Sequence, residues 1–193
     1  MMQEPIRQKN LVRNMLLLAL LFSVFVGIVV YIISLFLTPK YQAETKVLIT
    51  DNQDKNGEYN SGAQDAAGVF AEIINSKSFV EDLFSQAGVG FDSTNLENGI
   101  INHIDAVISK DSPVIAIKLY HDNKEDLAKV SKAVLDVLNN KKYDLGKSKE
   151  INITQLDPPY VYSNPVSPKP FKNAAIAFFV VLAIGTIFVY AKT

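Results

Sequence analysis

The sequence predicts an α+β domain, a mainly antiparallel sheet with helices on one face, held between two transmembrane helices. Three observations support this prediction. Two uncharged apolar runs lie near the two ends of the 193-residue chain. Between them, segments with period-two alternation are interspersed with segments of helical period. Five of the eight prolines fall within a short stretch that precedes the second apolar run.

The two apolar runs are long enough to cross a bilayer. The first, Met15 to Leu37, has 23 residues without a charge, and the second, Asn173 to Ala191, has 19; a spanning helix needs about 20. The first run is apolar on all sides, which favours a membrane span over the core helix of a soluble protein. Its length exceeds the apolar core of a signal peptide, about 7–15 residues, and no A-x-A-like site follows, so we expect an uncleaved anchor.

Charges beside the apolar runs predict the orientation. The N-terminal tail carries Arg7, Lys9 and Arg13 against Glu4, whereas residues 38–173 hold 15 lysines, no arginine and 19 acidic residues. Basic residues in short flanks mark the cytoplasmic side of a membrane protein. We therefore expect both termini in the cytoplasm and the central domain outside, in a bacterial cytoplasmic membrane.

The predicted boundaries follow from these runs. They are 1–14 for a cytoplasmic N-terminal tail, 15–37 for the first transmembrane helix, 38–157 for the extracytoplasmic α+β domain, 158–172 for a proline-rich juxtamembrane segment, 173–191 for the second transmembrane helix and 192–193 for a cytoplasmic end.

The central domain is expected to begin with a half-buried strand from Tyr41 to Thr50. One face would carry Ala43, Thr45, Val47 and Ile49, and the other Glu44, Lys46 and Leu48. Residues 51–62 are polar and rich in Gly and Asn, which is typical of a loop. Its Asn52-x-Asp54-x-Asn56 spacing is similar to the start of a calcium loop, but Ala63 stands where a bidentate Glu is required, which favours a solvated loop.

Two short helices are predicted next, with a break near Asn75-Ser76. The first is indicated by apolar residues at helical spacing, Ala66, Phe70, Ile73 and Ile74. The second is indicated by the capping-box pattern Ser78-Phe-Val-Glu81, and Gly88 is its expected end.

A hairpin, a long helix and a last strand complete the domain. The hairpin strands are predicted at 104–108 and 114–120, and the last strand at 151–156. The helix follows a second capping-box pattern, Asp122-Asn-Lys-Glu125. Its buried face would carry Leu127, Val130, Val134, Val137 and Leu138, and its outward face Lys129, Lys132 and Asp136. The predicted order is β-α-α-β-β-α-β, with the first and last strands side by side.

The prolines from Pro158 to Pro170 predict an extended, polyproline-like spacer, because each fixes φ near −65° and removes a backbone donor. We expect Pro165, Pro168 and Pro170 to set the height and angle of the domain above the bilayer. On the residues alone, a generic juxtamembrane linker is an equal alternative.

The sequence contains no recognisable motif for catalysis. The chain has no cysteine, and its two histidines, His103 and His121, lack the spacing of a zinc site. Nucleophile, phosphate-loop and dinucleotide motifs do not occur. The formal net charge of −1 lacks the excess of basic residues that is typical of a nucleic-acid-binding protein. We therefore expect no enzyme activity, cofactor or metal, which argues against an exported hydrolase.

Four segments, in order, resemble the Wzz chain-length determinant family, also called polysaccharide co-polymerases. They are Tyr41-Gln-Ala-Glu-Thr-Lys-Val-Leu-Ile after the first anchor, Ile74-Asn-Ser-Lys-Ser-Phe-Val, Ile115-Ala-Ile-Lys-Leu-Tyr-His-Asp-Asn-Lys-Glu-Asp-Leu-Ala, and Pro165-Val-Ser-Pro168-Lys-Pro170 before the second anchor. The resemblance implies an α/β membrane-proximal domain, assembly into homo-oligomeric rings, and regulation of the length of a surface polysaccharide made from a lipid-linked glycan by a partner polymerase.

The chain departs from the larger family members. It has no room for their long extracytoplasmic helix and is more similar to the compact Gram-positive forms, which can pair with a separate cytoplasmic tyrosine kinase. The sequence ends at Thr193, so a fused kinase is not expected. The outward helix face with Lys129, Lys132 and Asp136 is a candidate subunit contact. The alternative function is an extracytoplasmic sensor or adaptor module that activates a separate kinase.

Overall fold

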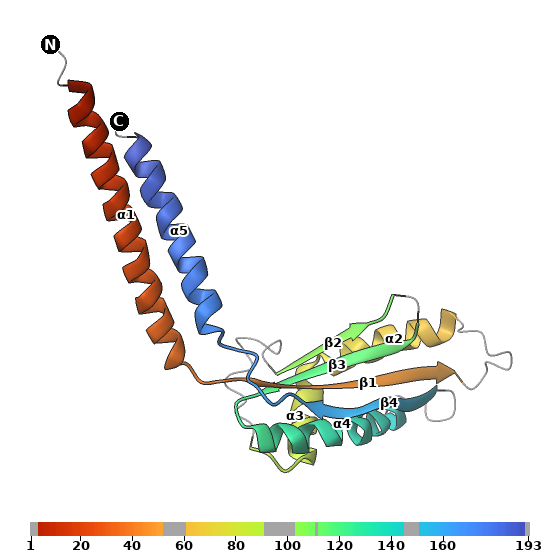
Figure 1. The fold of residues 1–193 in the computed structure, drawn as a ribbon. Coiled ribbons are helices and arrows are strands. Elements are labelled where there is room, and N and C mark those ends of the chain that lie inside the picture. Colours follow the sequence, from red (N-terminus) through yellow and green to blue (C-terminus); the bar gives the residue numbers. More distant parts are fainter. Residues whose placement is uncertain (1–3, 52–60, 91–102, 111, 145–150, 192–193) are drawn as a thin grey trace. The chain divides into compact units, whose positions relative to one another are not determined.

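The computed structural model of the chain describes residues 4–51, 61–90, 103–110, 112–144 and 151–191 (Figure 1). These residues form two compact units, one made of residues 1–39 with 167–193 and the other of residues 40–166. The elements in chain order are α1 (Glu4–Leu35), β1 (Tyr41–Asp51), α2 (Ser61–Ile74), α3 (Lys77–Gln86), β2 (Ile104–Ile108), β3 (Val114–His121), α4 (Lys124–Asp144), β4 (Ile151–Val161) and α5 (Pro170–Ala191). The predicted order between the two apolar helices is confirmed.

The first unit is the pair of helices α1 and α5. Both contain segments long and apolar enough to cross a membrane, Leu11–Leu35 and Pro170–Ala191. Small residues allow them to pack closely: a Cβ added at Gly185 would lie 2.9 Å from the Cβ of Ala19. A Cβ at Gly27 would lie 3.4 Å from the carbonyl oxygen of Ala174. The close approach of small residues is a common way for apolar helices to associate.

The second unit contains a four-stranded antiparallel sheet with strand order β2-β3-β1-β4. β1 pairs with β3 from Tyr41↔His121 to Leu48↔Val114, and on its other side with β4. The predicted adjacency of the first and last strands of the domain is therefore confirmed. At the end of this pair, the Val166 amide donates to the Lys40 carbonyl oxygen (2.8 Å).

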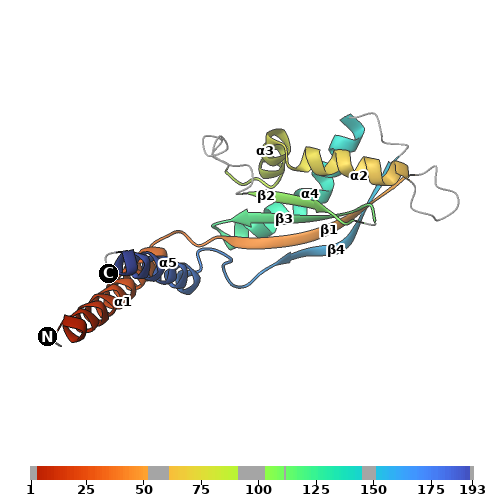
Figure 2. The same ribbon diagram turned by 90° about the horizontal axis from the view of Figure 1, so that it is seen from above.

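Helices α2, α3 and α4 pack on one face of the sheet and bury a single core (Figure 2). Alternate residues of the strands point into it, such as Val47 of β1 and Ile117 of β3. The helices contribute apolar residues at helical spacing, as the sequence predicted for α4: Leu127, Val130, Val134, Val137 and Leu138 are all buried. The α+β fold class, with helices on one face and two candidate transmembrane helices, is confirmed.

The helix starts differ from the predicted capping boxes. Helix α3 is capped by Ser76 rather than Ser78, because the Ser76 Oγ accepts from the Phe79 amide (3.3 Å). Helix α4 begins one residue later than expected, since the Asn123 Oδ1 accepts from the amides of Glu125 (2.8 Å) and Asp126 (3.2 Å). In both cases the capping side chain belongs to the residue types favoured at helix starts. Gly88, the predicted end of α3, has a positive φ of 65°.

The last strand is longer than predicted. β4 continues past Leu156, through Pro158 and Pro159, to Val161. It lies at the edge of the sheet, where a strand can accommodate prolines because one side of its backbone needs no ladder partner. At the other end of the expected spacer, α5 begins at Pro170, in keeping with the preference of proline for the first helical position.

Candidate functional site

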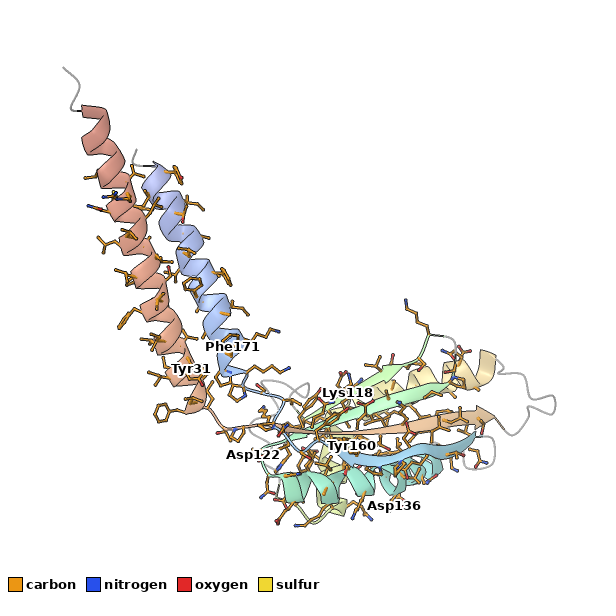
Figure 3. The ribbon with its side chains drawn as sticks, viewed as in Figure 1. Tyr31, Lys118, Asp122, Asp136, Tyr160 and Phe171 are labelled. Carbon is orange, nitrogen blue, oxygen red and sulfur yellow. The ribbon has the colours of Figure 1, made fainter. Side chains whose placement is uncertain are left out.

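The face of the sheet opposite the core carries polar and aromatic side chains near the start of β1 and apolar ones, such as Leu48 and Val107, further along. We call it the open face and define it by Gln42, Glu44 and Lys46 of β1, Asp105 of β2, Lys118 and Tyr120 of β3, and Asp157, Tyr160 and Tyr162 at the β4 end. Each of the β1 and β3 residues alternates with a buried one, so the face follows directly from the pleat. Figure 3 labels Lys118 and Tyr160 on this sheet.

The strand register places four of these residues in one row across the sheet. Asp105 pairs with Lys118, Lys118 with Glu44, and Glu44 with Tyr160. Directly paired residues have Cβ atoms about 4.5–5.5 Å apart. The row therefore alternates acid, base, acid and aromatic ring within a short span.

Two tyrosines at the β4 end form the aromatic part of the open face. The rings of Tyr160 and Tyr162 meet edge to face, with centroids 5.1 Å apart and an interplanar angle of 84°. The Tyr162 hydroxyl donates to the Glu44 Oε2 (3.3 Å), and the Glu44 carboxylate raises the pKa of Tyr162. Tyr160 is 60% exposed and Tyr162 38% exposed, so both rings are available to a ligand.

Lysine and acid side chains on this face neutralise one another. The Lys46 Nζ lies 3.2 Å from the Asp157 Oδ2. Burial raises the pKa of Tyr120, and the nearby carboxylates of Asp105 and Glu44 raise it further. Two lysines stand against three carboxylates over the whole face, so it has no strong field of either sign.

A β-bulge positions the tyrosines. The pairing of β1 with β4 shifts register between Glu44 and Lys46 and again between Lys46 and Val47. Thr45, which is buried opposite the shift, donates its hydroxyl to the Asp157 carbonyl oxygen (2.9 Å) and accepts from the Gln155 Nε2 (3.0 Å). The two shifts together add two residues, so the even-numbered residues of β4 stay on the open face, and the bulge places Tyr160 opposite Glu44 instead of Gln42.

The predicted subunit contact lies on α4. Lys129, Lys132 and Asp136 are all exposed on its outward side, and Figure 3 labels Asp136 there. The Lys129 Nζ lies 2.9 Å from the Asp126 Oδ1 one turn earlier. The predicted outward orientation agrees with the structure, and a role as a subunit contact stays a prediction.

The three predicted prolines do not share one element. Pro165 precedes Val166, whose amide donates to the Lys40 carbonyl oxygen. Pro168 lies in the connection to α5, and Pro170 is the first residue of that helix. Their role in setting the domain above a membrane stays a prediction.

The two histidines lie around one aromatic ring. The ring centroids of His103 and His121 are 5.9 Å and 5.7 Å from that of Phe84. Burial lowers the pKa of His103, and the charges of Lys40 and His121 lower it further. Within the described residues no cluster of three metal-ligating side chains occurs. The residues 52–57 that are similar to a calcium loop lie outside the described residues.

The tyrosines of the open face were not predicted as site residues from the sequence. The outward side of β1 was predicted, including Glu44 and Lys46. Tyr160 and Tyr162, however, fall in the segment that the prolines assigned to a spacer. The signal that could have found them is the alternation Tyr160-Val161-Tyr162, which has the pattern of a strand.

Comparison with known proteins gives a consistent result. Residues 8–87 match the family model for Wzz, the chain length determinant protein. The chain is 26% identical over 152 residues to the probable capsular polysaccharide biosynthesis protein YwqC of Bacillus subtilis (strain 168), which covers 76% of this chain and 60% of that protein. It is 23% identical to the capsular polysaccharide type 8 biosynthesis protein cap8A of Staphylococcus aureus, over 98% of this chain and 82% of that protein.

The type 5 counterpart, cap5A of Staphylococcus aureus (strain Newman), is 22% identical over the same shares of the two chains. The match to the Bacillus protein covers 60% of the length of that protein, which is less than two thirds. Together these matches confirm the resemblance to the Wzz chain-length determinant family and to its Gram-positive capsule members.

Proposed function

We propose that this chain, which resembles the Wzz chain-length determinant family, is a non-enzymatic membrane protein that regulates the chain length, polymerisation and export of a surface polysaccharide. The observation that carries the proposal is the family match over residues 8–87. That stretch covers β1, α2 and α3 together with most of α1, so it joins the candidate membrane anchor to half of the domain.

The proposed mechanism is geometric. Several copies assemble in the bacterial cytoplasmic membrane, with α1 and α5 as anchors, both termini in the cytoplasm and the sheet domain outside. The assembly contacts the polymerase and its lipid-linked glycan and biases the length at which growth stops. The outward face of α4, with Lys129, Lys132 and Asp136, is the proposed contact between copies. Pro165, Pro168 and Pro170 fix the path from the domain to its second anchor.

Deletion of the gene tests the proposed function directly. The size distribution of the surface polysaccharide should shift, and expression of the chain from a plasmid should restore it. An unchanged size distribution in the deletion strain would refute the proposal. The mass of the detergent-solubilised particle tests the assembly separately: a multiple of the 21.3 kDa chain supports it, and a monomer contradicts it.

Proline 168 offers a finer test. Replacing Pro168 with Ala releases φ at that position, so we expect a shifted polysaccharide length with an unchanged thermal stability of the domain. Val69→Ala, a change at an exposed residue of α2 away from the proline segment, serves as the control and should leave the length unchanged. A stable Pro168→Ala protein that gives the wild-type length would contradict the role of the proline.

The paired anchors favour a second candidate function, an extracytoplasmic sensor or adaptor that activates a separate cytoplasmic tyrosine kinase. Two closely packed helices can transmit a change in the domain across a membrane. Phosphotyrosine on a coexpressed kinase, compared in the presence and absence of the chain, distinguishes the candidates. Kinase activation with an unaltered polysaccharide length would place the adaptor function first.

A further inference from the structure

The open face has the features of a ligand-binding surface rather than of an ordinary solvated sheet. Within the described residues of the sheet unit, residues 40–166, the helices pack on the opposite face (Figure 2). Solvated faces of sheets usually carry scattered charges and β-branched residues. Here two exposed aromatic rings meet at the edge of an ordered row of charged groups, Asp105, Lys118 and Glu44.

The chemistry of this surface fits a saccharide. Tyrosine offers an apolar ring face and a polar hydroxyl, and the axial C–H groups of a sugar ring make weak favourable contacts with such a face. Carboxylate and ammonium groups accept from and donate to sugar hydroxyls. The open face supplies both kinds of group in neighbouring positions, with Tyr160 paired to Glu44 and Glu44 to Lys118.

The charges argue against other occupants. A membrane surface is recognised by clusters of lysine and arginine, whereas the lysines here are balanced by carboxylates, as in the Lys46–Asp157 pair. The core of a protein–protein interface is depleted of charged residues, whereas this row places three charged groups side by side next to the exposed tyrosines. A neutral or weakly charged glycan matches both the charge balance and the mixture of rings and hydrogen-bonding groups.

We propose that the open face binds a segment of the polysaccharide chain, with Tyr160 stacking on a sugar ring and with Glu44, Lys118 and the Tyr162 hydroxyl bonding to its hydroxyl groups. This proposal rests on the proposed role in polysaccharide biosynthesis and adds the site of contact. The Tyr162–Glu44 hydrogen bond holds the carboxylate beside the exposed ring of Tyr160 before the glycan arrives. The row runs across the strands, so a bound glycan would cross all four of them.

Saturation-transfer NMR on the full-length protein in detergent micelles tests this site. The probe is a set of oligosaccharides made by partial acid hydrolysis of the surface polysaccharide of the producing strain. The method detects binding as weak as about millimolar, so we expect a transfer signal from sugar C–H protons with the wild-type chain. Absence of any signal at millimolar oligosaccharide would overturn the proposal.

Matched variants locate the binding. Tyr160→Ala should weaken binding at least tenfold, whereas Tyr160→Phe, which keeps the ring, should weaken it by less than threefold. Val69→Ala, a change at a 51% exposed residue of α2 on the other side of the sheet, should leave it unchanged. Equal binding by Tyr160→Ala and the wild type would overturn the site.

Two further readouts separate this site from the proposed function. If Tyr160→Ala changes the particle mass in detergent, the open face is a contact between copies, and the glycan site is refuted. If deletion of the gene shifts the polysaccharide length but Tyr160→Ala binds oligosaccharide normally, the proposed function stands and the site is wrong. Loss of binding with an unchanged particle mass supports the site.

Discussion

Replacing Thr45 with Val should weaken the joint between β1 and β4. The Thr45 side chain is buried at the β-bulge, where the ladder between the strands is interrupted. Its hydroxyl joins β1 to the Asp157 carbonyl (2.9 Å) and to the Gln155 side chain (3.0 Å) of β4. Valine keeps the shape of threonine but removes both interactions.

The size of the effect follows from these two hydrogen bonds. An intramolecular hydrogen bond contributes about 0.5–1.5 kcal/mol, and a buried group left without a partner costs more. The Gln155 amide is partly exposed and can turn to water, so most of the loss comes from the Asp157 carbonyl. We expect the free energy of unfolding to fall by about 1–2 kcal/mol, which lowers the melting temperature of a domain of this size by roughly 3–10 °C.

Thermal unfolding followed by circular dichroism in mild detergent measures the change, with Ser131→Ala as the matched control. The Ser131 hydroxyl is as deeply buried, but it donates within its own helix to the Ala128 carbonyl (3.0 Å). That carbonyl lies in the interior of α4 and keeps its backbone partner, so the control should lose less than about 0.5 kcal/mol. Equal losses in the two variants would refute the reasoning that the Thr45 hydroxyl joins two strands.

Three other predictions concern the helices and the pH dependence of stability. Gly68→Ala should stabilise the domain by about 0.5–1 kcal/mol in chemical denaturation, since Gly68 lies inside α2 with open space where a Cβ would point; a destabilised variant would contradict this. Gly185→Leu should separate α1 from α5, because even a Cβ there would lie 2.9 Å from that of an alanine of α1. The native side chains of Ser34 and Asn173 are hydrogen-bonded (3.2 Å), so a Ser34→Cys/Asn173→Cys pair should form a disulfide on oxidation. Adding Gly185→Leu to this pair should lower the disulfide yield severalfold, and an unchanged yield would contradict the close packing of the two helices. Burial lowers the pKa of His103 below its ordinary value of 6.5, so as the pH falls through 6.5 the unfolded chain takes up the proton first. Stability should therefore decrease from pH 7.5 to 5.5, and a His103→Gln variant with an equally steep decrease would show that another group is responsible.

The order of the elements could be predicted because one-sided burial leaves a direct pattern in the sequence. In β1, every second residue from Ala43 to Ile49 is buried, so the two faces could be assigned from alternation alone. In α4, the spacing from Leu127 to Leu138 gave the buried face in the same way. These patterns depend only on local geometry and on the need to cover one face of the sheet.

The start of α3 could not be predicted in the same way, because tertiary contacts decide between two serines. Ser76 and Ser78 are both suitable caps by residue type. The Asn75 side chain pairs with the backbone of Ala106 on the edge strand β2, accepting from its amide (3.1 Å) and donating to its carbonyl (3.4 Å). This contact accompanies the helix break at Asn75, so the next residue, Ser76, becomes the cap.

The extent of β4 was mispredicted for a related reason. Two consecutive prolines normally end a strand, because neither can donate to a ladder. Here Pro158 and Pro159 lie opposite Thr45 in the bulge, where the hydroxyl of Thr45 bonds to the carbonyl of Asp157. The sequence shows the prolines but not the side chain of a distant strand that accommodates them. Tyr160 and Tyr162 therefore escaped detection as site residues.

The joint between β1 and β4 connects the stability of the domain to both proposed activities. It carries the bulge that places Tyr160 opposite Glu44, and at its end the Val166 amide donates to the Lys40 carbonyl, where both connections to the apolar helices leave the sheet. A variant that loosens the joint without unfolding the core should therefore weaken oligosaccharide binding more than its loss of stability alone explains. Thr45→Val is such a variant, since at 25 °C a loss of 1–2 kcal/mol from a stability of about 5–15 kcal/mol leaves nearly all molecules folded. Oligosaccharide binding by Thr45→Val equal to that of the wild type would show that the placement of Tyr160 beside Glu44 does not depend on the bulge.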